Sequence, residues 1–121
     1  AGVLMDLPNP PTAIVCVSDM MALGALEALD ARSLTPGEDV SVIGYDGLYF
    51  GKHANPPLTT LAQPQAHAGR RLGDILLSII DGADPIKFQE LQRAHLVQRM
   101  TDGPANVNAG QEDVSIREEP Q

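Results

Sequence analysis

Two short apolar runs on either side of an amphipathic helical pattern constrain the fold of this chain more than any other feature. The runs are Ala13–Val17 and Val40–Tyr45, and both are rich in β-branched residues and too short for helices. Such runs are typical of strands buried on both faces of a sheet. Residues 20–33 between them repeat apolar side chains every three or four positions, which predicts a helix. Strand, helix and strand in this order predict an α/β fold, a parallel sheet flanked by helices.

The remaining elements extend this pattern in both directions. Residues 1–7 have the character of the last turns of a helix, which a proline-rich segment ends. Residues 58–61 form a short strand candidate, residues 66–81 predict a strongly amphipathic helix, and residues 88–100 carry two weak strands. The apolar face of the long helix consists of Leu72, Ile75, Leu76, Ile79 and Ile80.

Length and composition fit one small domain or part of a larger one. The chain has 121 residues, and its hydrophobic fraction of 43% is sufficient for a packed core. Cys16 is the single cysteine, so no disulfide forms within the chain, and its place in an apolar run predicts a buried thiol. No apolar run approaches the roughly 20 residues of a membrane span, and no signal-peptide pattern is present. We expect a cytoplasmic protein with no membrane partner.

The net charge of -8 is shared equally between the body and a C-terminal segment. Residues 102–121 hold five acidic side chains and one arginine, while the preceding residues hold eleven acids and seven bases. The segment is polar and has no sustained period, so we expect a disordered acidic tail over residues 102–121. Binding of nucleic-acid phosphates requires clustered Lys and Arg. These 121 residues are therefore not expected to bind DNA themselves.

Motifs for catalysis and metal binding are weak. The histidines His53, His67 and His95 are far apart and lack metal-ligand spacing. The segment around Ser18 is not G-x-S-x-G, and the glycines near Gly44 do not make a dinucleotide fingerprint. We expect no catalytic residue, no metal and no cofactor. A small α/β hydrolase is the enzymatic alternative, but it requires a nucleophile–base pair that the sequence does not supply.

Polar residues at the ends of the two predicted strands indicate a binding site. Ser18 follows the first strand and Asp46 ends the second. Ligands of open parallel sheets bind beyond the carboxyl ends of the strands, where a carboxylate can accept hydrogen bonds from sugar hydroxyls or an amine. The alternative is local, with Ser18 or Asp19 capping the helix and Asp46 starting a turn. For Asp19 we prefer the cap.

Three motifs follow one another in a fixed order along the chain. They are P-T-A-I-V-C-V-S-D-M-M-A-L-G at residues 11–24, E-D-V-S-V-I-G-Y-D at residues 38–46 and P-P-L-T-T-L-A-Q-P at residues 56–64. Their order and spacing resemble LacI-type transcriptional regulators, the lactose- and purine-repressor family. The resemblance covers nearly all of residues 2–101.

The resemblance implies a partial periplasmic-binding-protein-like (type I) fold, mainly its C-terminal lobe. Residues 1–101 would form the C-terminal part of an effector-binding and dimerisation domain, with residues 66–92 contributing to the N-terminal lobe. The helix-turn-helix that reads DNA in this family is not present in this chain. The apolar face of the helix at residues 66–81 would then lack its usual partner. We expect it to be buried against the chain's own sheet or a second copy.

The function implied is that of a ligand-responsive, DNA-binding transcriptional regulator that senses a sugar or related small metabolite. Asp46 matches an effector-contacting Asp of the family, and Ser18 matches an effector-contacting Asn with a shorter side chain. Candidate dimer contacts, matching positions where relatives pair two C-terminal lobes, are Leu23, Glu27, His53 and Ala54. We expect a homodimer or higher homo-oligomer that reaches DNA only through the helix-turn-helix. The alternative is an extracytoplasmic sugar-type solute-binding protein of the same fold.

Overall fold

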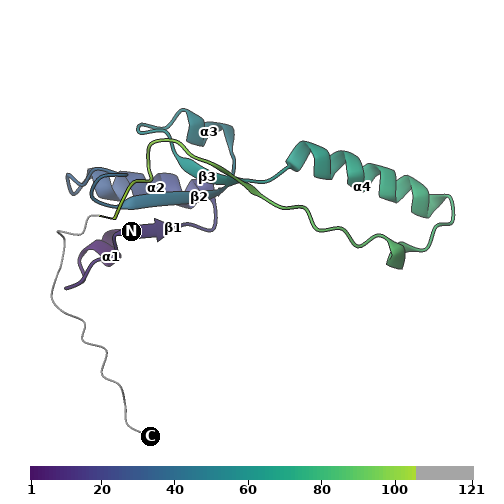
Figure 1. Ribbon diagram of the computed structural model, residues 1–121, viewed down its shortest axis with the longest axis horizontal. Helices are drawn as coiled ribbons and strands as arrows, with labels where there is room; N and C mark the ends of the chain where they lie inside the picture. The colour runs from purple at the N-terminus through teal and green to yellow at the C-terminus, as the bar shows by residue number, and fades with distance from the viewer. Residues whose placement is uncertain (106–121) are drawn as a thin grey trace, which may run out of the picture.

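Helices and strands alternate along the chain as the apolar patterning predicts. A computed structural model describes residues 1–105, and Figure 1 shows their arrangement. The elements are α1 (Gly2–Met5), β1 (Ala13–Val15), α2 (Asp19–Asp30), β2 (Ser41–Asp46), α3 (Tyr49–Lys52), β3 (Thr59–Ala62), α4 (Gln65–Ile80), a 3-10 turn (Pro85–Lys87) and β4 (His95–Val97).

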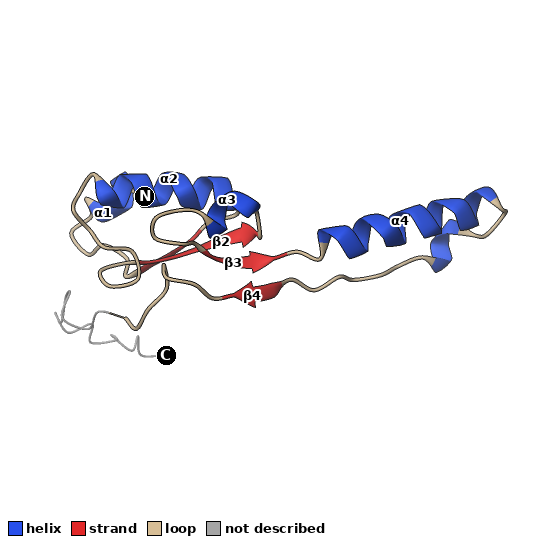
Figure 2. Cartoon of the chain, turned by 90° about the horizontal axis from the view of Figure 1, so that it is seen from above, coloured by secondary structure: helices blue, strands red, loops and turns tan. Residues whose placement is uncertain are grey.

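The four strands form one sheet in the order β1-β2-β3-β4. The predicted parallel pairing is confirmed for β1 with β2, where Val15 pairs with Ile43, and for β2 with β3. Residues 88–100 hold one strand where the alternation predicted two. This strand, β4, is antiparallel to β3, with Thr60 opposite Val97. Its direction is reversed because the chain returns toward the sheet after α4 without crossing over it (Figure 2).

The core lies between α2 and one face of the sheet. Figure 2 shows α2 and α3 on the same side of the strands. The buried apolar side chains are Cys16, Ala22, Ala25, Leu26, Leu29, Val40, Val42 and Leu58. Leu29 and Leu58 have no exposed surface, and burying a side chain of this size stabilises a fold by roughly 1.5–3 kcal/mol. Helical spacing on α2 therefore aligns its apolar stripe with the sheet.

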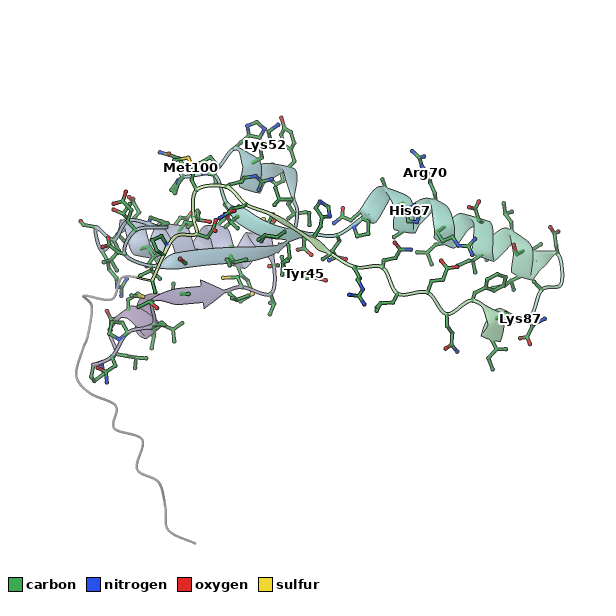
Figure 3. The ribbon with its side chains drawn as sticks, in the orientation of Figure 1. Tyr45, Lys52, His67, Arg70, Lys87 and Met100 are labelled. Atoms are coloured by element: carbon green, nitrogen blue, oxygen red, sulfur yellow. The ribbon has the colours of Figure 1, made fainter. Side chains whose placement is uncertain are left out.

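The opposite face of the sheet is open. Val15 is 70% exposed and Val17 is 77% exposed, so the prediction that the first strand is buried on both faces is wrong. Together with Cys16 and Tyr45 they line a shallow apolar hollow. Figure 3 shows Tyr45 on the side of the sheet away from Lys52 of α3. The reason is that, of the two long helices in residues 1–105, α2 packs on the other face and α4 projects away from the sheet.

α4 and the return segment that follows it, residues 81–94, project from the sheet as an arm (Figure 1). Arg71 forms an ion pair with Glu90 of the return segment, and Arg71 Nε donates to Glu90 Oε2 over 2.9 Å. The guanidinium holds the pKa of the Glu90 carboxyl below its ordinary value. Ile75 and Ile79 are half-buried, whereas Ile80 is 70% exposed. The expectation that the apolar face packs on the chain's own sheet is therefore wrong, because α4 continues away from the end of β3.

A strap formed by residues 98–103 joins the strands at the other end of the sheet. The Thr101 hydroxyl accepts from the Thr59 N–H over 2.9 Å and donates to the Val42 carbonyl over 2.6 Å. Thr101 is fully buried, and Asp102 accepts from Gln98 Nε2 and from the Thr59 hydroxyl. The predicted tail therefore begins too early, because residue 102 is bound to the sheet. Residues 106–121 lie outside the described part of the chain.

We predict that the 121-residue chain self-associates through the exposed apolar face of α4. Leu72, Leu76 and Ile80 lie on this face and are all exposed. Leu76→Lys should weaken association at least about tenfold, since it places a charge where apolar area would be removed from water. Light scattering coupled to size exclusion over a concentration series measures the effect.

The matched control is Asp74→Asn, which changes the charge by the same amount on the opposite face of α4. In Figure 3 Arg70, four residues before Asp74, points away from the return segment. The control should associate as the wild type does. A wild-type chain that stays monomeric at high concentration would contradict the prediction.

Candidate functional site

The carboxyl ends of the three parallel strands bring the candidate site residues to one edge of the sheet. Ser18 follows β1, Asp46 ends β2, and Gln63 follows β3. Because the strands are parallel, these residues lie at the same edge, where ligands of such sheets bind. The sequence identified Ser18 and Asp46 but missed Gln63. A polar residue two positions after the strand predicted at residues 58–61 was the signal that could have found it.

Ser18 caps α2. Its hydroxyl accepts from the Met21 N–H over 3.2 Å, and its backbone is extended, as at a typical N-cap. The local interpretation of Ser18 is therefore confirmed. The side chain is half-buried, so its hydroxyl hydrogen can still donate to a neighbouring group.

Asp46 presents a carboxylate that is only partly engaged. Its Oδ1 accepts from Gln63 Nε2 over 2.9 Å, and its carbonyl accepts from the Gln63 N–H over 3.2 Å. Gln65 Nε2 also donates to this carbonyl over 3.4 Å. Among the described residues, none donates to Oδ2. Two glutamines therefore orient Asp46 and leave one carboxylate oxygen able to accept from a ligand.

The backbone at Asp46 adopts an uncommon conformation. Its φ is 124°, and Gly47 follows with a φ of 78°. A residue with a Cβ rarely has positive φ, and such conformations persist where surrounding contacts hold them. A turn therefore does begin at Asp46, and this turn sets the direction of its side chain.

Asp19 does not cap the helix, contrary to the preferred interpretation of the sequence. It is fully buried, its Oδ2 accepts from the Leu48 N–H over 2.6 Å, and its Oδ1 accepts from the Thr60 hydroxyl over 2.5 Å. Ser18 already occupies the cap, which leaves the Asp19 carboxylate free to reach other strands. A glycine inside the second apolar run, Gly44, was the available signal, because a strand glycine marks a close approach.

Cys16 is a buried thiol, as predicted. It lies directly after β1 within the core, and burial raises the pKa of its thiol. Within residues 1–105, no three His, Cys, Asp or Glu side chains gather in a way that could hold a metal ion. No helix described here has the length and apolar character to cross a membrane.

The candidate dimer residues come together on the surface formed by α2 and α3. Leu23, Glu27 and Ala54 line one groove. His53 precedes Ala54 in the chain. The centroid of its ring is 4.4 Å from the centroid of the Tyr49 ring. Tyr49 and Phe50 are both exposed and have an edge-to-face arrangement. The sequence did not single out these two aromatic residues, which widen the apolar part of the surface.

Comparison with known proteins gives a consistent set of relatives. The family model of the periplasmic binding protein-like domain matches residues 2–101. The HTH-type transcriptional repressor CytR of Escherichia coli (strain K12) is 47% identical over 96 residues, which are 79% of this chain and 28% of the repressor.

Solved structures of transcriptional regulators also match this chain. A LacI family transcriptional regulator from Arthrobacter sp. FB24, in complex with lactose, matches with a TM-score of 0.73 and 29% identity over 82% of this chain and 37% of that chain. The lac repressor dimer bound to operator and the anti-inducer ONPF matches with a TM-score of 0.66 and 34% identity over 78% and 32% of the two chains. The chain therefore spans 28–37% of the length of these relatives.

We predict that Gly44→Ala destabilises the chain by about 1–3 kcal/mol. A Cβ at this position would overlap Asp19 Oδ1 and lie 3.0 Å from a methyl carbon of Leu58. Urea unfolding followed by circular dichroism measures the change in the free energy of unfolding.

Gly24→Ala is the matched control. A Cβ at position 24 meets no atom within 4 Å, and alanine is favoured over glycine inside a helix by roughly 0.5–1 kcal/mol. Equal free energies of unfolding for Gly44→Ala and the wild type would contradict the close packing of Gly44 against Asp19.

Proposed function

The chain belongs to the periplasmic binding protein-like domain family, and we propose that it forms the C-terminal part of the effector-binding and dimerisation domain of a LacI-type transcriptional repressor. The family match over residues 2–101 and the repressor relatives support this assignment. Residues 66–92, which make up most of the arm, would extend into the N-terminal lobe. The exposed apolar face of the arm supports that placement, since the sheet does not cover it.

The observation that carries the proposal is the partly engaged carboxylate of Asp46 at the carboxyl edge of the parallel strands. Gln63 fixes one carboxylate oxygen, and the other can accept a hydrogen bond from a sugar hydroxyl. The Ser18 hydroxyl lies at the same edge and can donate or accept. A sugar or related small metabolite is therefore the effector class that we propose. The lactose bound to the Arthrobacter regulator supports this class.

Regulation would follow from a shift between lobe arrangements. An effector that binds one arrangement more tightly raises its population and so changes the affinity of a distant DNA-binding head. The head would be a helix-turn-helix outside these 121 residues, and the regulator would act in the cytoplasm. The lac repressor relative is a dimer bound to operator.

The α2–α3 surface is the proposed dimer contact. Leu23, Glu27 and Ala54 line its groove. His53 lies next to Ala54 in the chain, and its ring is close to the exposed ring of Tyr49, which meets Phe50 edge to face. Aromatic side chains are enriched in the buried centres of protein interfaces. The extracytoplasmic solute-binding alternative is less well supported, because the relatives that match this chain are repressors.

We predict that Asp46→Ala in the intact regulator lowers the affinity for its effector by at least about tenfold and leaves operator binding unchanged. Removing the carboxylate deletes a charge-assisted hydrogen bond and does not touch the DNA-binding head. Operator affinity is measured at increasing concentrations of mono- and disaccharides, beginning with lactose.

Glu38→Ala is the control. It removes an exposed carboxylate from the turn that precedes β2, at the opposite edge of the sheet. Its titration should match the wild type. An Asp46→Ala regulator that responds to the sugar as the wild type does would refute the assignment of Asp46.

A further inference from the structure

Asp19 is the one acidic side chain in the described residues that has no exposed surface. A buried carboxylate is costly unless donors satisfy it, and here each oxygen accepts one hydrogen bond. The donors come from distant parts of the chain, the Leu48 N–H 29 residues away and the Thr60 hydroxyl 41 residues away. The carboxylate therefore joins the start of α2, the turn after β2 and the strand β3.

The bond to Leu48 lies next to the residue that carries the proposed effector contact. The turn runs from Asp46 through Gly47 to Leu48, and its first two residues both have positive φ. Gln63 holds the turn at Asp46, and Asp19 holds it two residues later. Leu48 is also the N-cap of α3, and its side chain forms no capping hydrogen bond. Loss of the Asp19 bond would leave the far side of this turn without its buried acceptor.

The surroundings of Asp19 leave little room for its carboxylate to move. Gly44 of β2 has its backbone against Oδ1, and a Cβ at Gly51 would lie 3.6 Å from Oδ2. The side chain is therefore held between two glycine backbones, with its two oxygens directed at different donors. Such packing fixes the Leu48 N–H in one place relative to β2 and β3.

We infer that Asp19 is a positioning residue for the effector site, which it serves by holding the Asp46–Gly47–Leu48 turn in the conformation that presents the Asp46 carboxylate. The part of this inference that concerns effector binding rests on the proposed function, whereas the part that concerns the conformation of the turn does not. Asp19 itself has no exposed surface, so a ligand at this edge of the sheet would not touch it. Its effect is transmitted through Leu48.

The chemistry of the two donors predicts which substitution is tolerated. Asparagine can direct its oxygen at the Leu48 N–H, which can only donate, and its NH2 group at the Thr60 hydroxyl, which can accept. Asp19→Asn should therefore keep both contacts. Asp19→Ala removes both and takes from the half-buried Leu48 N–H its only acceptor among the described residues.

Hydrogen-exchange NMR on the 121-residue chain tests the positioning. In the wild type, the Leu48 amide should be protected at least about tenfold relative to an unstructured amide, because its hydrogen bond is to a buried charged acceptor. In Asp19→Ala this protection should fall about tenfold or more, while the amide of Val42 in the core keeps its protection. Asp19→Asn should restore it.

The control is Asp30→Asn, at the exposed end of the same helix, which should change nothing at Leu48. An unprotected Leu48 amide in the wild type overturns the inference without any variant, even if Asp19→Ala fails to fold. Loss of Leu48 protection in Asp19→Asn equal to the loss in Asp19→Ala also overturns it, since the loss would then come from charge or packing and not from the two hydrogen bonds.

Sugar titration of the intact regulator provides the second measurement. With lactose, or the sugar of the same panel that binds the wild type most tightly, Asp19→Ala should weaken binding about tenfold and Asp19→Asn should restore it. Wild-type affinity in a folded Ala variant would overturn the inference. If no sugar binds the wild type, the proposed function fails, and the exchange measurements still decide whether Asp19 holds the turn.

Discussion

The buried Asp19 carboxylate is the interaction on which the geometry of this end of the sheet depends. It accepts one hydrogen bond from the turn after β2 and one from β3, and it does so from the first residue of α2. Strand pairing, apolar contacts and the hydrogen bonds between Gln63 and Asp46 also connect these elements. A directional pair of hydrogen bonds in a region of low dielectric fixes their relative placement more tightly.

The sheet has two unlike faces, and this asymmetry accounts for the rest of the architecture. α2 closes one face with a compact aliphatic core, while Val15, Val17 and Tyr45 remain open on the other. Exposed apolar surface of this kind marks places where other protein surfaces pack. The matched segment is 28–32% of the length of the repressor relatives, which is consistent with a fold whose described part leaves faces uncovered.

Periodicity in the sequence predicted the helices and strands well, because each depends on side chains close together in the chain. The helix at residues 20–33, the strand at residues 40–45 and the long helix all correspond to elements of the structure. The direction of β4 was missed because a strand pattern carries no information about its partner. Asp19 was assigned to a cap because its true donors lie 29 and 41 residues away. Asp46 lies at the carboxyl edge of the sheet, as its place at the end of a strand predicted, but the glutamines that orient it follow a different strand.

The arm is inserted between two strands of the sheet, β3 and β4. It leaves after β3 through Gln63 and Pro64, and it returns through the residues just before β4. Any rotation of the arm as a rigid body must therefore be absorbed by these two connections. One of them carries Gln63, whose side chain and backbone both bind Asp46. A rotation of the arm that displaces Gln63 would therefore also disturb the hydrogen bonds that orient the Asp46 carboxylate.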